Sequence, residues 1–329
     1  MALRSMTKQL TYSDTFTASV QTIAPKIGMK PYFGGLTTEE IIATCQLLQS
    51  LKEEVAIDYI GTAIIDAADV MTEKAKIQQL MTQLQDLAIS ATFTLQPEQF
   101  GLLLDVDECY NVISDVAAFA KKTGHFITLQ TAEYEHVQTI ISMAQQLQAT
   151  YDHVSVVIQG QFYRSQDDIE ALQDAPVTLS KKLSNTSEAV AFQKKMDLDL
   201  NMIALVEQRL KSGAYTVIAT HDRNIIAYAK RLAQEFDIHP SQFEFQLHIG
   251  QDDVLKQALI ADGYRVRTYF PAGAYWYTHF MNHVANRPQN LKYVSEKVFT
   301  KKTNIALVTI AGALLLRKVF KRKNNNKEA

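Results

Sequence analysis

The feature that most constrains the fold is a regular alternation of short β-rich runs with longer amphipathic segments. Each run is rich in β-branched and aromatic residues, as strands are, and turn residues separate it from its neighbours. The runs are Val55–Ile60, Ile89–Leu95, Phe126–Thr131, His153–Ile158, Val177–Ser180, Tyr215–Ala219, Phe243–Leu247 and Tyr264–Phe270. Helical spacing marks the segments Thr72–Leu87, Val106–Lys122, Ala132–Leu147, Ser187–Lys211 and Asp222–Phe236.

Eight strands separated by helices over roughly 230 residues have the count and size of a (β/α)8 TIM barrel. A doubly wound open sheet also alternates, but it usually has fewer strands and a glycine-rich phosphate turn after the first one. Here the first run ends in Asp58, Tyr59, Ile60 and Gly61, without that glycine pattern. The sequence therefore predicts an α/β fold of the TIM-barrel type.

The segments outside the barrel give the predicted domain organisation. Residues 1–50 read as N-terminal helices, and Thr37 precedes an apolar helical segment as an N-cap would. Residues 51–298 hold the barrel, and its last strand should run through a turn at Pro271 and Gly273 into a helix. Residues 299–329 form a basic and hydrophobic C-terminal tail.

Composition limits the class of protein. Of 329 residues, 47% are hydrophobic and 21% charged, as in a globular protein, and a net charge of −2 gives no reason to expect nucleic acid. The two cysteines, Cys45 and Cys109, lie in apolar helical patterns and should be buried thiols. The N-terminus lacks the apolar core of a secretory signal, so we expect a cytoplasmic body.

The C-terminal tail contains an apolar run, Ile305–Leu316, between clusters of lysine and arginine. Twelve helical residues span roughly 18 Å, whereas a hydrocarbon core is roughly 30 Å thick. Shallow insertion, aided by the basic clusters on anionic lipid, fits this length better than a full crossing. The alternative is a final helix docked on the body.

In a barrel of this kind the chemistry sits where the strands end at their C-terminal side. The residues that the sequence places there are Gln96, Gln130, Gln159, Lys181, Lys182, Thr220, His221, Gln246 and Tyr269, with Asn282 and His283 from the helix after the last strand. This set contains no carboxylate. The histidines lack the spacing of metal ligands, and no GxSxG nucleophile turn is present, so neither a metal site nor a serine hydrolase is expected.

Three features of this set have a structural as well as a functional interpretation. Asp222 suits the N-cap of a helix, and His221 could simply bond to backbone. Lys181 and Lys182 suit an anion such as phosphate, but they equally suit a solvated loop. Aromatic residues could stack on a planar cofactor or belong to the core; they are Tyr269, Tyr275, Trp276 and Tyr277.

Read together, several segments resemble the single-domain, FAD-dependent proline dehydrogenases of bacteria. The matching text is DYIG, VVIQGQFYRSQDDIEAL, VAFQKKMDLD, SGAYTVIATHDRNIIAYAK, FEFQLHIG, GYRVRTYFPAG and WYTHFMNHVANRPQNL, which runs collinearly through roughly residues 50–298. The resemblance implies a (β/α)8 barrel that binds FAD, oxidises L-proline to pyrroline-5-carboxylate, passes electrons to membrane quinone and associates with the membrane. The apolar tail at residues 305–316 agrees with the expected membrane association.

The resemblance also implies roles for individual residues. Gln159 stands where the family has a glutamine near the flavin, and Lys181 matches the FAD-contacting lysine of the motif VRLVKGAY. Thr220 and His221 match the motif ATH on the dinucleotide side, and Gln246 at the seventh strand end joins this cofactor-binding set. Tyr269 matches the tyrosine that closes over the proline ring.

Other positions depart from the family pattern. The arginine of VRLVKGAY is Thr178 here, and its glycine is Lys182. The family lysine after the second strand is Gln96, and the aspartate after the third is Gln130. The paired arginines that hold the substrate carboxylate are Asn282 and His283.

These replacements predict an impaired or retuned proline site. Two guanidinium groups hold a carboxylate bidentately, whereas asparagine is neutral and histidine is only partly charged near pH 7. Removing one partner of a buried charge pair costs about 2–5 kcal/mol, or roughly thirty- to several-thousandfold in binding. We therefore expect a flavoprotein of this family that acts on a small amino or imino acid and passes electrons to quinone. The alternative is a non-catalytic, membrane-tethered paralogue that acts by binding a partner.

Overall fold

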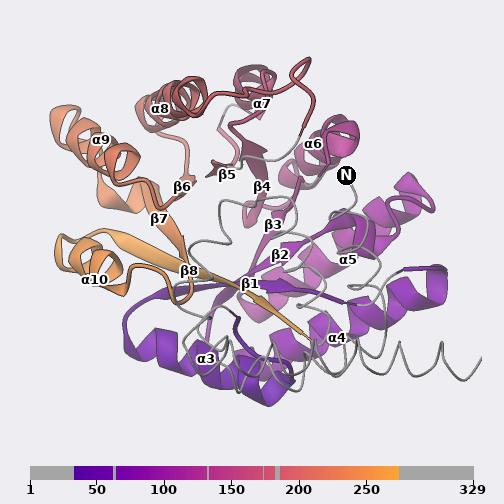
Figure 1. Ribbon diagram of the computed structural model, residues 1–329. Helices are drawn as coiled ribbons and strands as arrows, with labels where there is room; N and C mark the ends of the chain where they lie inside the picture. The colour runs from indigo at the N-terminus through magenta and orange to yellow at the C-terminus, as the bar shows by residue number, and fades with distance from the viewer. Residues whose placement is uncertain (1–32, 62–63, 132, 173, 182–185, 274–329) are drawn as a thin grey trace, which may run out of the picture. The chain divides into compact units, whose positions relative to one another are not determined.

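Eight parallel strands close into one barrel in the order in which they occur along the chain (Figure 1). The computed structural model describes residues 33–61, 64–131, 133–172, 174–181 and 186–273, and all of these belong to one compact unit, Pro31–Trp276. The strands are β1 (Glu54–Tyr59), β2 (Ala91–Leu95), β3 (Phe126–Leu129), β4 (Val154–Gln159), β5 (Val177–Ser180), β6 (Thr216–Ala219), β7 (Phe243–His248) and β8 (Arg265–Ala272). The predicted TIM barrel is confirmed.

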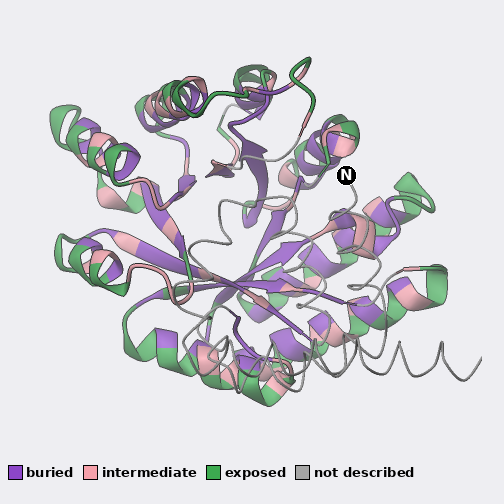
Figure 2. Ribbon diagram, viewed as in Figure 1, coloured by how far each residue is buried: buried purple, intermediate pink, exposed green. Residues whose placement is uncertain are grey.

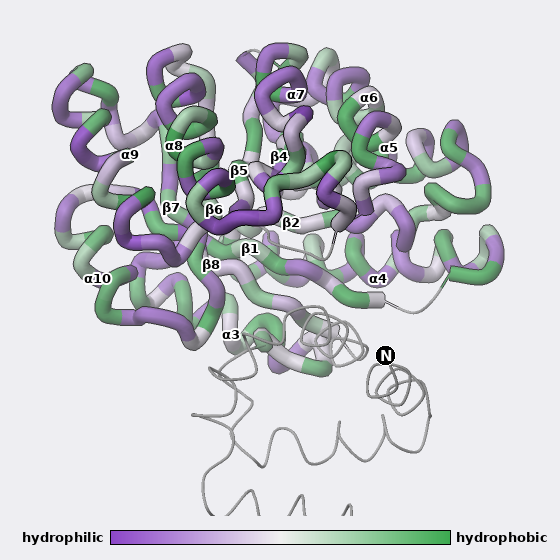
Figure 3. The backbone as a smooth tube through the Cα atoms, turned by 45° about the horizontal axis from the view of Figure 1, so that its top comes forward, coloured by the Kyte–Doolittle hydropathy of each residue, from purple (hydrophilic) through white to green (hydrophobic). Residues whose placement is uncertain are grey.

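Helices surround the strands and bury one face each against them. They are α3 (Thr38–Ser50), α4 (Ala67–Asp86), α5 (Val106–Thr123), α6 (Val137–Gln148), α7 (Ser165–Leu172), α8 (Lys195–Ser212), α9 (Arg223–Glu235) and α10 (Asp253–Ala261), with short 3₁₀ turns at Pro97–Phe100, Tyr134–His136 and Pro240–Gln242. Figure 2 shows the strands buried and the helices exposed on their outer sides. Figure 3 shows the same amphipathic pattern as a change of hydropathy along each helix.

Local signals at the helix ends explain where several helices begin. Thr37 is the N-cap of α3 and accepts a hydrogen bond from the backbone N–H of Glu40, as the sequence predicts. Asp66 caps α4 and forms a reciprocal capping box with Asp69. Asp105 caps α5 by accepting from two backbone N–H groups. Short polar side chains therefore set these boundaries; of the three caps, Thr37 was predicted from the sequence, and the start of α4 was predicted at Thr72 rather than at Ala67.

Some predicted boundaries were wrong. The segment predicted as a helix from Ser187 becomes helical only at Lys195, because the preceding residues form a turn whose Ala191 makes a β-bridge to Phe162. No ranges were predicted for α7 and α10, since eight or nine residues give too few turns for a clear periodicity. Pro271 does not begin a turn but lies inside β8, where its carbonyl accepts from the N–H of Gly34 at 2.9 Å.

Buried ion pairs join neighbouring elements near the N-terminal ends of β7, β8 and β1. Arg267 of β8 pairs with Glu244 of the neighbouring strand β7, and its guanidinium also donates to the carbonyl of Val55 at 3.1 Å. Outside the strands, Lys256 of α10 pairs with Glu53 at 3.3 Å, and both side chains are 2% exposed. These contacts join β8 to β7 and to the start of β1, at the seam where the sheet closes.

The two cysteines are buried, as predicted. Cys45 lies in α3 and Cys109 in α5, and burial raises the pKa of each thiol to about 12. Both thiols are therefore protonated at neutral pH.

The predicted terminal segments lie largely outside the described residues. Of residues 1–50, the described part contributes α3, and the tail at 299–329 is not described. In the part of the chain that the structure describes, no helix is long and apolar enough to cross a membrane.

Candidate functional site

The carboxyl ends of the eight strands form one rim, which we call the mouth of the barrel. Because the strands follow one another around the barrel in sequence order, β4 lies opposite β8. Of the predicted site residues, Lys182, Asn282 and His283 lie outside the described residues, as do Tyr275, Trp276 and Tyr277. The other predicted residues divide between two sides of the mouth.

A carboxylate lies at the β8–β1–β2 side of the mouth, contrary to the sequence prediction that the strand ends carry none. Asp58, near the end of β1, is 1% exposed and accepts a hydrogen bond from the hydroxyl of Tyr269. Its other oxygen accepts from the amide of Gln96 at 3.0 Å. The prediction was wrong because it passed over Asp58, which lies within β1 near its end.

The hydrogen-bond partners that the described residues give Asp58 are both neutral. Among the described residues, no lysine, arginine or histidine forms an ion pair with it. Burial, followed by the nearby charge of Asp58 and the hydrogen bond to it, raises the pKa of Tyr269 well above 10. Tyr269 therefore remains a hydrogen-bond donor throughout the physiological pH range.

Two histidines extend this group along the mouth. The ring of His248, at the end of β7, meets the ring of Tyr269 edge-on at 4.8 Å between centroids. The rings of His221 and His248 are 5.6 Å apart, and the backbone N–H of His248 donates to Nε2 of His221 at 3.2 Å. His221 therefore bonds to backbone, and Asp222 caps α9, as the structural interpretation of this pair predicts.

The hydrogen bond to His221 assigns its tautomer. Since Nε2 accepts, the ring proton of a neutral imidazole must lie on Nδ1. Burial is the main cause that lowers the pKa of His221, so the ring is neutral near pH 7. Nδ1 is buried and has no hydrogen-bond partner among the described residues. His221 thus offers a donor for which the described part of the chain supplies no acceptor.

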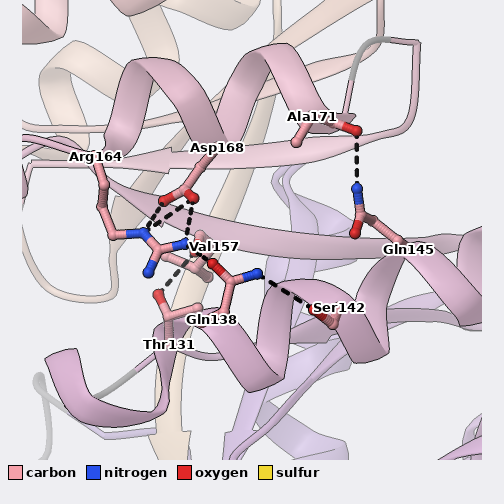
Figure 4. Close-up of polar contacts among 8 residues, drawn as sticks. All are labelled: Thr131, Gln138, Ser142, Gln145, Val157, Arg164, Asp168 and Ala171. Atoms are coloured by element: carbon pink, nitrogen blue, oxygen red, sulfur yellow. Dashed lines mark hydrogen bonds and ion pairs between the residues drawn. The ribbon is translucent and has the colours of Figure 1, made fainter.

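At the β3–β4 side, Gln159 lies in a chain of buried side chains. Its Nε2 donates to the hydroxyl of Thr131 at 3.3 Å. That hydroxyl donates in turn to the carbonyl of Val157 at 2.8 Å, a bond drawn in Figure 4. Its Oε1 accepts from the amide of Gln161 at 3.0 Å. Thr131, Gln159 and Gln161 are at most 2% exposed. The sequence interpretation missed Thr131 and Gln161, which lie just beyond the strand ends.

The loop that follows Gln159 is held on several sides. Arg164 makes a bidentate ion pair with Asp168 of α7 and donates to Gln138 of α6 at 2.6 Å (Figure 4). Gly160 lies against α8, where an added Cβ would come 2.3 Å from the sulfur of Met202. The backbone that carries Gln159 is therefore packed tightly between neighbouring helices.

Lys181, at the end of β5, is fully engaged in ion pairs. Its ammonium group lies 2.7 Å from Asp222, the N-cap of α9, and also pairs with Asp199 of α8. Burial tends to raise the pKa of both aspartates, but the bonds to Lys181 and the charge of Lys195 outweigh it, so both pKa values are lowered. Lys181 is thus neither a solvated charge nor an uncommitted phosphate ligand.

The remaining predicted residues lie in strands or directly after one. Gln246 lies in β7, paired in register with Ala219 and Arg267. Thr178 of β5 is 3% exposed, with its hydroxyl 3.5 Å from that of Ser155. Gln130 follows β3, and its backbone N–H donates to the carbonyl of Leu95. Among the described residues, no group of three or more acidic, histidine or cysteine side chains is placed to hold a metal.

Comparison with known proteins identifies the family. The family model described as proline dehydrogenase matches residues 180–282. Proline dehydrogenase 2 of Bacillus subtilis (strain 168) is 32% identical over 273 residues, which cover 82% of this chain and 89% of that protein. The chain belongs to the proline dehydrogenase family. Proline dehydrogenase 1 of the same strain is 28% identical over 301 residues, 91% of this chain and all of that relative.

Solved structures agree with the barrel of the proline dehydrogenase family. Proline utilization A from Bdellovibrio bacteriovorus superposes with a TM-score of 0.70 over 79% of this chain, at 17% identity. A variant of proline utilization A from Bradyrhizobium japonicum gives 0.64 over 78% of the chain, also at 17% identity. This chain spans about a third of the length of these solved proteins, 33% and 30%. At such identities the likeness concerns the fold.

The proline dehydrogenase family is FAD-dependent, and the residues of this mouth fit a flavin in part. The β4–β6 side presents the Gln159 amide, the Thr220 hydroxyl and the Nδ1–H of His221, which has no partner among the described residues; these are neutral groups that suit the heteroatoms of an isoalloxazine and its attached chain. Lys181 already pairs with Asp199 and Asp222, so a phosphate that contacted it would share its positive charge with these two carboxylates. The donor set fits a flavin, with a weaker contribution from Lys181 than the family motif implies.

Proposed function

We propose that this protein is an FAD-dependent dehydrogenase that oxidises a small secondary amine or imino acid related to proline. The observation that carries the proposal is the division of the mouth into two chemically different sides. One side, β4–β6, presents neutral donors and acceptors from Gln159, Thr220 and His221. The other side, β8–β1–β2, contains the buried carboxylate Asp58 beneath Tyr269 and Gln96.

The β8–β1–β2 side supports an amine as the substrate group. A carboxylate has about four lone-pair positions, and the hydrogen bonds from Gln96 and Tyr269 occupy two of those of Asp58, so it retains capacity for an ammonium N–H. A negative charge in a poorly hydrated site attracts a cation and repels a substrate carboxylate. Asp58 would then accept a hydrogen bond from the amine directly. If Tyr269 stays between them, Asp58 would attract the ammonium group electrostatically without contact.

The reaction converts a C–N single bond into a C=N bond, which removes two electrons and two protons from the substrate. FAD, when bound, supplies the two-electron acceptor, and the family passes these electrons on to quinone. Asp58 holds the ammonium and can take its proton at a carboxylate oxygen. Tyr269 covers the ring and limits access of water, and its raised pKa keeps it from competing as a base.

The replaced residues support altered recognition of the substrate carboxylate. The sequence has Asn282 and His283 where the family has paired arginines, and Thr178 and Gln96 where it has an arginine and a lysine. These changes remove positive charge from a site that retains the negative charge of Asp58. We therefore propose that a cyclic amine without a carboxylate, such as pyrrolidine, is oxidised at least as well as proline.

Visible absorption and anaerobic reduction test the proposal. The purified protein should show flavin bands, or acquire them on addition of FAD. Under anaerobic conditions pyrrolidine should bleach these bands, whereas proline should do so weakly. Bleaching by proline alone would overturn the proposed substrate. A colourless protein that takes up no FAD would overturn the dehydrogenase and favour the non-catalytic paralogue.

We also propose that the protein is cytoplasmic and associates peripherally with the membrane through residues 305–316, which would bring the protein to the membrane that holds the quinone pool. The support is the apolar run between basic clusters in the sequence. Truncation after Glu296 should move the protein from the membrane fraction to the soluble fraction. An unchanged distribution would indicate a docked helix.

A further inference from the structure

The hydrogen-bond chain around Gln159 has a direction that the backbone imposes. The carbonyl of Val157 can only accept, so the hydroxyl of Thr131 must give it its single proton. Because that proton is used, the Thr131 oxygen can only accept from Gln159, whose Nε2 lies 3.3 Å away. The oxygen of the Gln159 amide is therefore turned to the other side, toward Nε2 of Gln161.

With Gln161 in its observed orientation, the opposite orientation of the Gln159 amide would lose both contacts. Its oxygen would face the Thr131 oxygen, whose proton is already used, and its NH₂ group would face that of Gln161. Two neutral hydrogen bonds of ordinary strength favour the observed orientation by a ratio of roughly 5 to 150. The three side chains are at most 2% exposed, so water does not replace the lost bonds cheaply.

We propose that Thr131 and Gln161 are positioning residues that fix the orientation of the Gln159 amide, and with it the pattern of donor and acceptor that the mouth presents to a flavin ring. The inference rests on the proposed function. It goes beyond it by assigning roles to two residues that touch Gln159 rather than the reacting atoms. Neither residue lies in the named strands, since β3 ends at Leu129 and β4 ends at Gln159.

The surroundings give the chain a rigid support. Thr131 is anchored on β4 through Val157, and the Gln161 backbone carbonyl accepts from the N–H of Phe192 at 2.8 Å. The loop beyond is held by the Arg164–Asp168 ion pair (Figure 4), and Asn201 of α8 donates to the Gly160 carbonyl at 2.8 Å. Movement of the Gln159 amide thus requires the breaking of its own bonds and not a motion of the loop.

Four variants of the full chain, titrated with FAD, test the inference. Thr131→Val removes the hydroxyl at constant shape, and Gln161→Leu removes the amide. Each should weaken FAD binding about three- to tenfold and shift the visible bands of the bound flavin. Thr131→Ser, which keeps the hydroxyl, should restore both. The double variant Thr131→Val/Gln161→Leu should lose less than the sum of the single losses, because both act on one amide.

Matched controls remove the same groups elsewhere. Thr82→Val and Gln85→Leu change exposed residues of α4 and should leave FAD affinity and spectrum unaltered. Circular dichroism confirms that each variant is folded, and Gln161→Leu carries the test if Thr131→Val does not fold. FAD binding with the wild-type affinity and spectrum in both variants would overturn the inference and leave the proposed function standing.

A second readout does not need the flavin. In the apoprotein, the side-chain NH₂ signals of Gln159 should be resolved by NMR and exchange slowly with solvent. In Thr131→Val this exchange should be at least fivefold faster. If the wild type fails to bind FAD, the proposed function is wrong, but slow exchange that depends on Thr131 still supports the fixed amide. Equal exchange in the two proteins would overturn it.

Discussion

The hydroxyl of Tyr269 donates a hydrogen bond to the carboxylate of Asp58, and this bond crosses from the last strand of the barrel to the first. The two strands pair in register, with Tyr269 opposite Ala56 and Asp58 opposite Pro271. Tyr269 thus leans toward the mouth, over the neighbouring strand. The contact joins the closing seam of the barrel to the only carboxylate that the described strands bring to this side of the mouth.

Tyr269→Phe should destabilise the protein, because Asp58 would keep a single described donor, Gln96. Leaving one buried acceptor position unfilled costs about 1–3 kcal/mol. Urea unfolding followed by circular dichroism measures the difference. Asp58→Asn in the Tyr269→Phe background should then cost less than in the wild type, because the partner is already missing. Equal costs in both backgrounds would show that the two residues are not coupled.

The stability of the protein should fall steeply at alkaline pH. The pKa values of Tyr269 and Tyr215 are raised, first by burial, so the unfolded chain loses phenolic protons above pH 10 while the native protein keeps them. The unfolded state then binds fewer protons, and the free energy of unfolding falls by up to about 1.4 kcal/mol per pH unit for each tyrosine. The buried thiols act in the same sense from about pH 9.

The variant Tyr269→Phe isolates one part of this alkaline effect. Below pH 9 its free energy of unfolding should run parallel to that of the wild type. Above pH 10 the wild-type curve should be the steeper one. Parallel curves up to pH 12 would mean that Tyr269 ionises in the folded protein at its ordinary pKa.

Arg267→Met should be strongly destabilising. The substitution leaves Glu244, which is 0% exposed, buried without its ion-pair partner. Breaking a buried ion pair costs about 3–5 kcal/mol, whereas replacing both partners by apolar residues is often neutral. The double variant Arg267→Met/Glu244→Leu should therefore recover most of the loss in thermal unfolding. The exposed pair Lys211–Glu207 is the control, and Lys211→Met should cost about 0.5 kcal/mol or less.

Lys181→Met should lower stability by roughly 1–3 kcal/mol at neutral pH, because Asp199 and Asp222 lose a shared charged donor. The lowered pKa values of these aspartates stabilise the wild type above about pH 4, and this contribution is lost as the pH falls through the folded values. The two proteins should therefore converge in stability toward pH 2. Lys195→Met, at a side chain 70% exposed, should have a much smaller effect, and a loss as large as that of Lys181→Met would contradict this assignment.

Asn282→Arg with His283→Arg should raise the affinity for proline only modestly. The pair restores the family's carboxylate clamp in sequence, but Gln96, Gln130 and Thr178 remain changed. Anaerobic flavin reduction by proline, compared with pyrrolidine, measures the shift in preference. Recovery of full proline turnover by these two substitutions would show that the other replacements have little influence.

The pattern of runs and helical segments predicted the barrel because both periodicities are local properties of the chain. A strand presents alternate residues to one face, and a helix returns every third or fourth residue to the same face, whatever lies around them. The caps at Thr37 and Asp222 were also local, since an N-cap needs only the first turn of its own helix. The family resemblance likewise rests on the order of residues along the chain.

The contacts of the site residues were harder to predict from the sequence. Lys181 reads as a free cation or a phosphate ligand until α8 and the loop before α9 bring Asp199 and Asp222 against it. Asp58 reads as an ordinary strand residue, because nothing in its neighbourhood along the chain indicates that Tyr269 and Gln96 will cover it. Residues 211 and 38 positions away in sequence supply its partners.

The sequence by itself determined the eight-stranded barrel, the family and most of the residues around the mouth. Tertiary structure decided which of these residues are charged, paired or oriented, as the directed chain from Gln161 through Gln159 and Thr131 to Val157 illustrates. The reason is physical. Secondary structure depends on the residues nearest in sequence, whereas hydrogen bonds and ion pairs depend on distances of about 3 Å that only closure of the barrel establishes.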